Sequence, residues 1–285
     1  MKAFLKRHGA PGNFSQLIAG LTVFLLIFHS FEPDVYELVL MVLVPVMLWN
    51  TAWLTNPWIW MIFGGFGAYA VFSDYIGTDN HKWLYMYWIF ALSIAFFHSK
   101  LSDQQKIIAL NARFFIVAAM GFSVFWKFMA QNWEFVNGAF MEYTFLSDDR
   151  FGTLLGWIGI APEVYEPWYD MTLDFEFRNG FQESFAVPRK VSLLATLTTW
   201  WILFSEAAVA LFFALGAYYK KVDILAHLFL MIFIVSTYLI APVMGFGTML
   251  CVLGLALSLA RFPRTLLPYG YLLCLMVLAF YDYFF

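Results

Sequence analysis

The sequence predicts an all-α integral membrane protein with about nine transmembrane helices, and three observations lead to that prediction. Of the 285 residues, 62% are hydrophobic and only 12% are charged, about half the charged share of a soluble domain. Apolar runs long enough to cross a bilayer follow one another along the chain. The runs lack the period-two alternation of barrel strands, so helices are the structure that satisfies their backbone inside lipid.

The expected helices divide a single membrane domain, residues 1–285, into regular segments. Polar clusters separate the apolar runs, which lie near residues 14–30, 35–54, 57–73, 82–98, 107–130, 191–218, 223–241, 245–260 and 265–281. Where only a few residues join two runs, as at Asn56–Pro57, we expect a tight antiparallel hairpin, because proline ends one helix and opens the next.

The distribution of basic residues predicts the orientation. With the N-terminus inside, the inner loops and helix ends hold most of the positive charge, namely Lys2, Lys6, Arg7, Lys100, Lys106, Lys220, Lys221, Arg261 and Arg264. Short cytoplasmic loops carry such an excess. We therefore expect a multi-pass protein of the cell membrane, or of the inner membrane in a bacterium, with a cytoplasmic N-terminus and an extracytoplasmic C-terminus.

One long segment, residues 131–190, separates the fifth and sixth helices. Its acidic residues outnumber its basic ones, and aromatic residues are interleaved with them. A disordered loop would not hold so many aromatics, whereas a lid on the membrane face needs them as anchors. We expect a folded, acidic, aromatic-rich extracytoplasmic cap, in which residues 151–160 are too short to cross and are re-entrant or interfacial.

Ionisable residues at bilayer depth are the candidate functional groups, because each one is costly to bury. They are His29, His81, His98, Arg113, Lys127, Glu206 and His227. The predicted topology brings His29, His81 and Lys127 to the outer leaflet beneath the cap and places Glu206 near mid-membrane. A lysine amine held away from water gives up its proton more readily, so it could act as a base or nucleophile.

Each of these residues also has a structural interpretation. Lys127 and Arg113 could extend their charged ends to the two membrane surfaces, with their stems packed on lipid. His81 could be a solvated or capping residue at a helix end. His29, His98 and His227 could be structural, and Glu206 could be a buried hydrogen-bonding partner between helices.

Several ligand classes are not expected. No basic tract could neutralise a row of phosphates, which argues against a nucleic-acid partner. Cys251 and Cys274 lie in apolar runs without metal-ligand spacing, so we expect neither a disulfide framework nor a metal site. Haem ligation by His29 and His81 is a further alternative that we do not expect, and a preparation without a Soret band would exclude it.

Residues 79–143 resemble part of a known family. The matching stretches are Asp79-Asn80-His81-Lys82-Trp83-Leu84-Tyr85, Arg113-Phe114-Phe115-Ile116-Val117 continuing to Lys127, Asn132-Trp133-Glu134-Phe135-Val136-Asn137-Gly138, and Met141-Glu142-Tyr143. They are similar to the vitamin K-dependent gamma-carboxylase and its bacterial relatives, the horizontally transferred transmembrane (HTTM) domain proteins. More loosely, Glu206, His227 and Gly245-Phe246-Gly247 resemble the later helices of that family.

The resemblance implies specific roles. The carboxylase uses a lysine in the matching helix as the base that deprotonates reduced vitamin K, and a histidine at the start of the preceding helix assists. The matching residues here are Lys127 and His81, and we include Trp133, Glu206 and His29 as substrate-binding candidates. The carboxylase's large lumenal domain has no counterpart before Phe285, so we do not expect glutamyl carboxylation.

Two hypotheses follow. In the first, the protein is an HTTM-type membrane enzyme that acts on a lipophilic substrate, quinone-like or lipid, near the outer leaflet. A quinone is then the possible cofactor. In the second, the helices form a scaffold without chemistry, and the acidic cap docks a protein partner. The bilayer itself is a partner in both.

Overall fold

The computed structural model describes residues 11–28, 34–73, 80–129, 135–173, 187–238, 240 and 243–284. All regular structure in these ranges is helical. The long helices are α2 (Pro11–Phe28), α3 (Asp34–Trp49), α4 (Pro57–Ser73), α5 (Asn80–Phe96), α6 (Leu101–Met129), α10 (Arg189–Gly216), α11 (Lys220–Tyr238), α12 (Met244–Arg261) and α13 (Leu267–Phe284). Each coincides with one of the apolar runs.

Four helices are long and apolar enough to cross a membrane, judged by length and composition. They are α6, α10, α11 and α12. Shorter apolar helices cover Phe14–Phe28, Pro57–Ser73 and Leu267–Tyr281. The described chain is therefore all-helical with four candidate membrane spans, which indicates a membrane protein.

Local side-chain chemistry sets the helix boundaries in the first half of the chain. The Oδ1 of Asn56 accepts a hydrogen bond from the backbone N–H of Trp58, and Pro57 opens α4, as expected for this pair. The run 35–54, expected as one helix, is interrupted. The Oδ1 of Asn50 accepts a hydrogen bond from the N–H of Ala52, so Asn50 caps a separate 3₁₀ turn, Thr51–Thr55.

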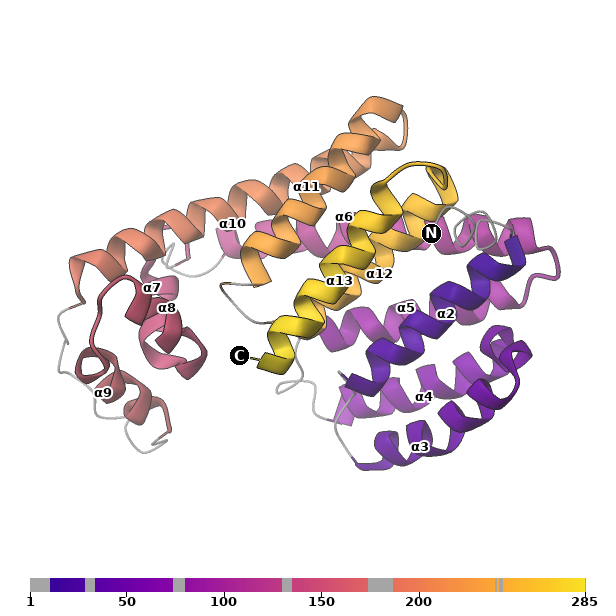
Figure 1. The fold of residues 1–285 in the computed structure, drawn as a ribbon, viewed down its shortest axis with the longest axis horizontal. Helices are drawn as coiled ribbons and strands as arrows, with labels where there is room; N and C mark the ends of the chain where they lie inside the picture. The colour runs from indigo at the N-terminus through magenta and orange to yellow at the C-terminus, as the bar shows by residue number, and fades with distance from the viewer. Residues whose placement is uncertain are drawn as a thin grey trace.

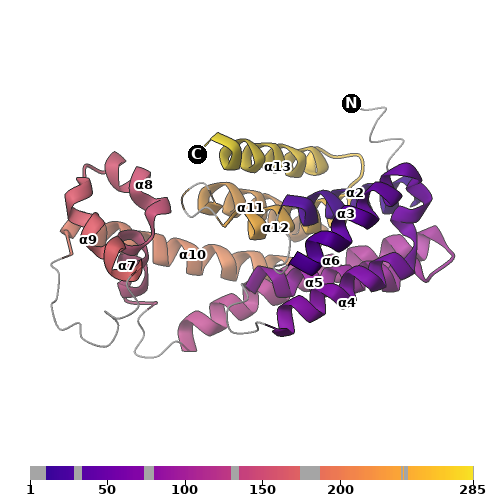
Figure 2. The same ribbon diagram turned by 90° about the horizontal axis from the view of Figure 1, so that it is seen from below.

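Helix α12 lies at the centre of the bundle and packs against α2, α5, α6, α11 and α13 (Figures 1 and 2). Its residues from Met249 to Leu259 are buried without exception. Two glycines allow close packing on this helix: Tyr238 and Leu278 lie against Gly247, and the Tyr271 ring lies against Gly254. A helix that is apolar on every side is typical of a fully buried position.

Residues 139–173 form a lobe at one end of the bundle (Figure 2). It contains α7 (Ala139–Ser147), the 3₁₀ turn Asp149–Phe151, α8 (Gly152–Trp157) and α9 (Pro162–Leu173), and it packs against the first half of α10. A second hydrophobic cluster, which includes Phe135, Phe145, Leu155, Ala195 and Leu203, holds it together. The segment predicted as a cap is thus helical and packed in its described part.

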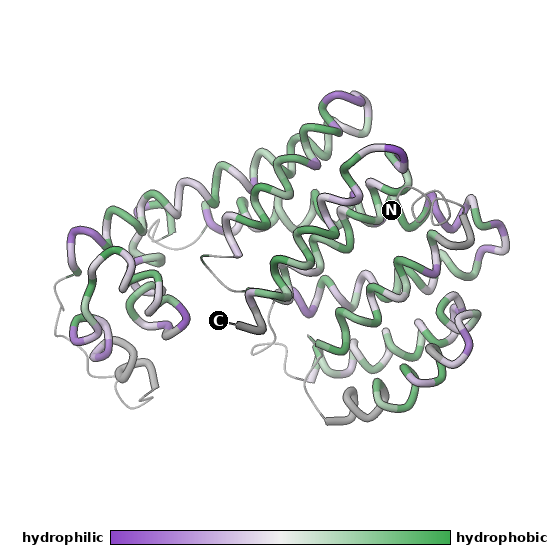
Figure 3. The backbone as a smooth tube through the Cα atoms, in the orientation of Figure 1, coloured by the Kyte–Doolittle hydropathy of each residue, from purple (hydrophilic) through white to green (hydrophobic). Residues whose placement is uncertain are grey.

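Hydrophilic residues gather at the ends of the long helices. Figure 3 shows hydrophobic residues along the middle of these helices and hydrophilic ones at the α10–α11 turn, at the α12–α13 turn and on α7–α9. Many outward-facing side chains in the apolar stretches are large and exposed, such as Phe114, Phe122 and Trp126 on α6. A bilayer around the bundle would cover them.

Candidate functional site: a lysine–glutamate pair beside a pocket

Lys127 lies in the last turn of α6 and binds Glu206 on α10. Its Nζ donates hydrogen bonds to both carboxylate oxygens of Glu206, each over 2.6 Å, and a third to the Oγ of Ser123 over 2.5 Å. Ser123, one turn earlier on α6, in turn donates to the Oε1 of Glu206 over 3.0 Å. The three side chains form a closed polar cluster between two helices.

This cluster is largely shielded from solvent. The side chain of Lys127 is 16% exposed and that of Glu206 is 7% exposed. The ring of Phe135, at the entrance to the lobe, lies 5.2 Å from the Lys127 Nζ in cation–π geometry. The amine therefore points between helices, toward Glu206, and not away from the bundle.

The pairing explains how two ionisable groups are accommodated in the interior of the helical bundle. Transferring an isolated charge out of water is costly, and the mutual attraction of the pair offsets that cost only when the remaining hydrogen-bonding capacity is also satisfied. Here the Ser123 hydroxyl supplies one additional acceptor for the amine and one additional donor for the carboxylate. The interpretation of Glu206 as a buried interhelical partner agrees with this geometry.

His81 lies at the start of α5, at the same end of the antiparallel α5–α6 pair as Lys127. Its ring packs edge-on to Tyr85 at 5.4 Å, and both side chains lie against Gly245, where α12 begins. The hydroxyl of Tyr85 donates to the carbonyl oxygen of Gly245 over 2.5 Å. His81 thus contacts α12, whereas Lys127 contacts α10.

The sequence predicted that His29, His81 and Lys127 lie together, and the described residues include only two of the three. Lys127 and His81 lie at one end of the bundle, but no hydrogen bond joins their side chains among those described for Lys127. Tyr238, at the end of α11, is buried against Gly247 of α12. His29 and Trp133 fall outside the described residues.

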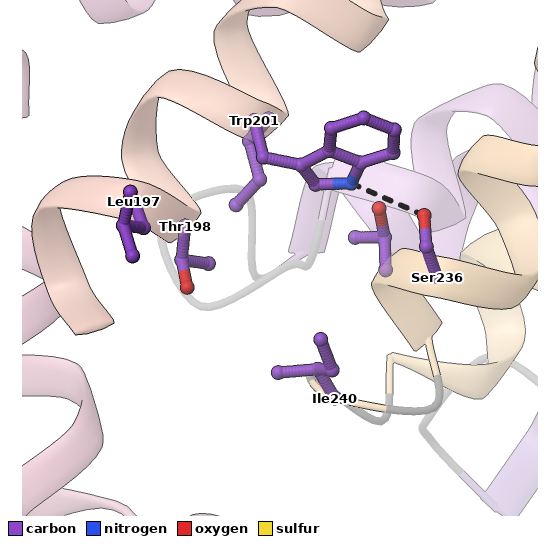
Figure 4. A pocket seen from close by; sticks show the side chains of 7 residues that line it. Leu197, Thr198, Trp201, Ser236 and Ile240 are labelled. Atoms are coloured by element: carbon purple, nitrogen blue, oxygen red, sulfur yellow. Dashed lines mark hydrogen bonds between the residues drawn. The ribbon is translucent and has the colours of Figure 1, made fainter.

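A pocket opens between α10 and α11. It has a volume of about 280 Å³ and is lined by Leu197, Thr198, Trp201, Ile202, Ser236, Thr237 and Ile240. Figure 4 shows Trp201 reaching across to Ser236, whose hydroxyl accepts the indole N–H over 3.1 Å. On α10, Ile202 precedes Glu206 by one helical turn, about 6 Å along the axis. The lining contains none of Ser123, Lys127 and Glu206, so the pocket, which faces α11, is separate from the polar cluster between α6 and α10.

A second buried charge cluster joins the opposite end of the same helices. The guanidinium of Arg113 donates to the carbonyl oxygen of Phe213, in the last turn of α10, and to the Oδ1 of Asp223, each over 2.7 Å. The Oδ2 of Asp223 lies 2.9 Å from the Nε of Arg261 on α12. Asp223 is fully buried, and Gly216 permits its close approach, because a Cβ there would meet Asp223.

Arg113 thus differs from the expectation that it would extend to the inner membrane surface. Its guanidinium is buried because Asp223 offers it a carboxylate inside the bundle. His227, one turn after Asp223, lies among the rings of Phe213, Phe262 and Tyr271. Its Nδ1 lies 2.8 Å from the Tyr271 hydroxyl, which agrees with a structural role.

Metal ligation has no candidate in the described ranges, where no group of three His, Cys, Asp or Glu side chains is placed to hold an ion. Cys251 and Cys274 are buried free thiols. Comparison of the chain with protein-family models, curated proteins and solved structures finds no match.

Proposed function

We propose that the protein is a multi-pass membrane enzyme of the HTTM type, in which Lys127 acts as a base on a lipophilic, quinone-like or lipid substrate. The observation that carries this proposal is the buried Ser123–Lys127–Glu206 cluster between α6 and α10. Buried ionisable groups within a membrane domain most often mark functional sites, since a purely structural contact is met at lower cost by apolar side chains.

Proton transfer within the cluster, from Lys127 to Glu206, would produce the neutral amine that acts as the base. In the resting pair the ammonium of Lys127 donates to Glu206. Because burial penalises both charges, transfer of one proton from Nζ to the carboxylate yields a neutral amine and a carboxylic acid at modest cost. The neutral amine then accepts the proton of a substrate hydroxyl: the O–H bond breaks, a new N–H bond forms, and the substrate oxyanion faces the Lys127 ammonium.

Ser123 and His81 have supporting roles in this proposal. Ser123 orients the Lys127 amine through its hydrogen bond, so the nitrogen keeps its position when Glu206 takes the proton. His81 is the proposed group that stabilises charge developing on the far side of the substrate. The packing of His81 and Tyr85 on Gly245 holds the imidazole in a fixed position, which favours such a role over that of a mobile surface residue.

The membrane arrangement belongs to the same proposal. We place nine spans in the bilayer, the N-terminus in the cytoplasm, the C-terminus outside, and the lobe on the extracytoplasmic face. Three basic residues are exposed at helix turns at the opposite end of the bundle, namely Lys220, Lys221 and Arg264. An excess of positive charge marks the cytoplasmic side, so these residues support this orientation. Lys127 and the pocket then lie near the outer leaflet.

A turnover assay tests the proposal. The purified protein in lipid nanodiscs is incubated with alkyl benzoquinols and with phospholipids, and consumption is compared between wild type, Lys127→Met and Lys106→Met. Lys106 is exposed on the same helix and serves as the matched control. Loss of a positioned base lowers kcat about 10²- to 10⁴-fold. Undiminished turnover by Lys127→Met would remove Lys127 from the mechanism.

A second candidate, a non-catalytic scaffold that docks a protein partner through the lobe, is favoured by one observation. Trp157 on α8 is 75% exposed, and Phe140 and Tyr143 on α7 are also exposed. Exposed aromatics beside acidic residues are typical of an interaction surface. Under this alternative, Trp157→Ala would abolish capture of a partner, while Lys127→Met would have no effect beyond stability.

A further inference from the structure

Exposed basic residues gather where two helix turns meet, at the end of the bundle opposite to the lobe. Lys220 and Lys221 begin α11, Arg261 ends α12, and Arg264 lies in the α12–α13 turn; all four are exposed. The two turns are adjacent, because the Nε of Arg261 lies 2.9 Å from the Oδ2 of Asp223, in the first turn of α11. Figure 3 shows both turns as hydrophilic ends of hydrophobic helices. We call the four exposed residues the turn cluster.

The positive charge of the turn cluster is only partly balanced. Asp223 is fully buried and also binds Arg113, so one carboxylate faces two guanidinium groups. No hydrogen bond from Nη1 or Nη2 of Arg261 to a described residue is found, and 37% of this side chain is exposed. The other three members of the cluster have no acidic partner among the described residues. Asp223 thus holds the Arg261 guanidinium in place while its terminal donors stay available to an anion.

The turn cluster lies at the ends of helices that are apolar enough to span a membrane. Three of the four candidate spans meet there, since α10 and α12 end and α11 begins at this end of the bundle. Tyr218 and Tyr219, in the α10–α11 turn, are 84% and 62% exposed. Exposed tyrosines at the end of a span are typical of the headgroup layer. The basic groups are therefore expected at the level of lipid phosphates.

An apolar stripe on α11 begins at the turn cluster. Leu225, Leu228 and Ile232 are each 40% or more exposed. Their spacing places them, together with Lys221, on one face of the helix, opposite to the buried Asp223. From Lys221 to Ile232 the stripe rises about 16 Å, about half the thickness of the hydrocarbon core of a bilayer. An acyl chain of one leaflet can lie along it while its head group stays beside Lys221.

From these observations we infer that the turn cluster binds the phosphate of an anionic phospholipid, with one acyl chain along the exposed stripe of α11. A guanidinium matches two phosphate oxygens at once, and the neighbouring amines add attraction. Basic side chains at the ends of membrane helices recognise such head groups. Free phosphate would share the ionic contacts and leave the stripe uncovered. The inference goes beyond the proposed function and does not depend on Lys127.

Native mass spectrometry with two named lipids tests the inference. The full chain in detergent micelles is titrated with dioleoyl phosphatidylglycerol or with dioleoyl phosphatidylcholine, and the apparent Kd of the first bound lipid is measured. Only the first lipid carries a net charge. Each basic group near the head group contributes about a fivefold preference for the anionic lipid, so phosphatidylglycerol should bind much more tightly. Equal Kd values for the two lipids would overturn the inference.

Charge variants locate the head group. Lys221→Gln and Arg264→Gln each remove one exposed charge of the turn cluster, so the Kd for phosphatidylglycerol should rise about fivefold, with the Kd for phosphatidylcholine unchanged. Arg189→Gln is the matched control, because Arg189 is exposed at the other end of α10. The unfolding temperature of each variant is recorded to show that the fold persists. Equal Kd values for Arg264→Gln and Arg189→Gln would contradict binding at the turn cluster.

Two further measurements distinguish a lipid from a free anion. At matched ionic strength, sodium phosphate should displace phosphatidylglycerol no better than sodium chloride; displacement by phosphate alone would make the free anion the ligand and overturn the lipid assignment. Leu228→Ser should weaken binding of dioleoyl phosphatidylglycerol and leave binding of the short-chain dihexanoyl lipid unchanged. Leu110→Ser, at an exposed position on α6, is the control. Equal effects of the two serine variants would remove the stripe from the site.

Discussion

The Nζ of Lys127, at the end of α6, contacts both carboxylate oxygens of Glu206 on α10, 79 positions later in the chain, at 2.6 Å each. This pair links two helices at the point where the bundle meets the lobe. The Lys127 amine also donates a hydrogen bond to Ser123 and lies over the ring of Phe135. Both the stability and the proposed chemistry of this region depend on the pair being kept intact.

Neutralising both partners is expected to destabilise the protein by less than the sum of the two single changes. Lys127→Met or Glu206→Gln alone leaves a buried charge unpaired and costs about 3 kcal/mol, whereas the double variant loses less than the sum, with a coupling energy of about 1–3 kcal/mol. Unfolding in mixed micelles, followed by tryptophan fluorescence, supplies the four values of the cycle. Additive losses would show that the two groups do not interact.

The Arg113–Asp223 contact predicts a second stability effect. Asp223→Asn removes the negative charge that faces two guanidinium groups, so the buried Arg113 keeps the Phe213 carbonyl but loses its counter-ion, and stability falls by about 3 kcal/mol. Glu163→Gln changes an exposed acid on α9 and serves as the control, with an expected change within about 0.5 kcal/mol. Equal unfolding midpoints for the two variants are incompatible with the buried cluster.

Alanine substitutions at two glycines in helix interiors are expected to change the stability of the protein in opposite directions. Gly254→Ala on α12 places a Cβ on the Tyr271 ring, and displacing Tyr271 breaks its contact with His227, so we expect a loss of about 1–3 kcal/mol. Gly121→Ala on α6 meets nothing within 4 Å and should stabilise the helix by up to about 1 kcal/mol. Thermal unfolding of the two variants should therefore shift in opposite directions.

The proposed topology predicts which sites react outside the cell. Both native cysteines are buried, so a single introduced cysteine reports its own side of the membrane. Glu163→Cys, on α9 of the lobe, should react with a membrane-impermeant maleimide in intact cells. Lys221→Cys, at the start of α11, should react only after permeabilisation. The reverse pattern would invert the assigned orientation.

The helices are the part of this fold that the sequence predicts well. Each long helix begins and ends within a few residues of an apolar run, because apolar length and flanking prolines carry that information locally. The sequence does not predict the break at Asn50. The side chain of this residue caps a new 3₁₀ turn inside a run that is apolar on both sides of it. Composition alone does not register a single capping residue.

The ion pairs are the part that the sequence does not supply. On α6, large apolar side chains occur all round the helix, so periodicity does not reveal that Lys127 faces α10. Asp223 follows Lys220 and Lys221 and is easily taken for a loop residue, which hides it as the partner of Arg113. One signal was available: Asp223, like Arg113, falls toward the inner end of its helix in the predicted topology.

Amine labelling of Lys127 tests the central claim most directly. The protein in nanodiscs is reductively methylated for a series of times, and mass spectrometry compares Lys127 with Lys106, which is exposed on the same helix. If Glu206 holds the amine inside the bundle, Lys127 is modified much more slowly than Lys106, and Glu206→Ala raises its rate. Equal rates in the wild-type protein would place the Lys127 amine at the membrane surface and contradict the proposed site.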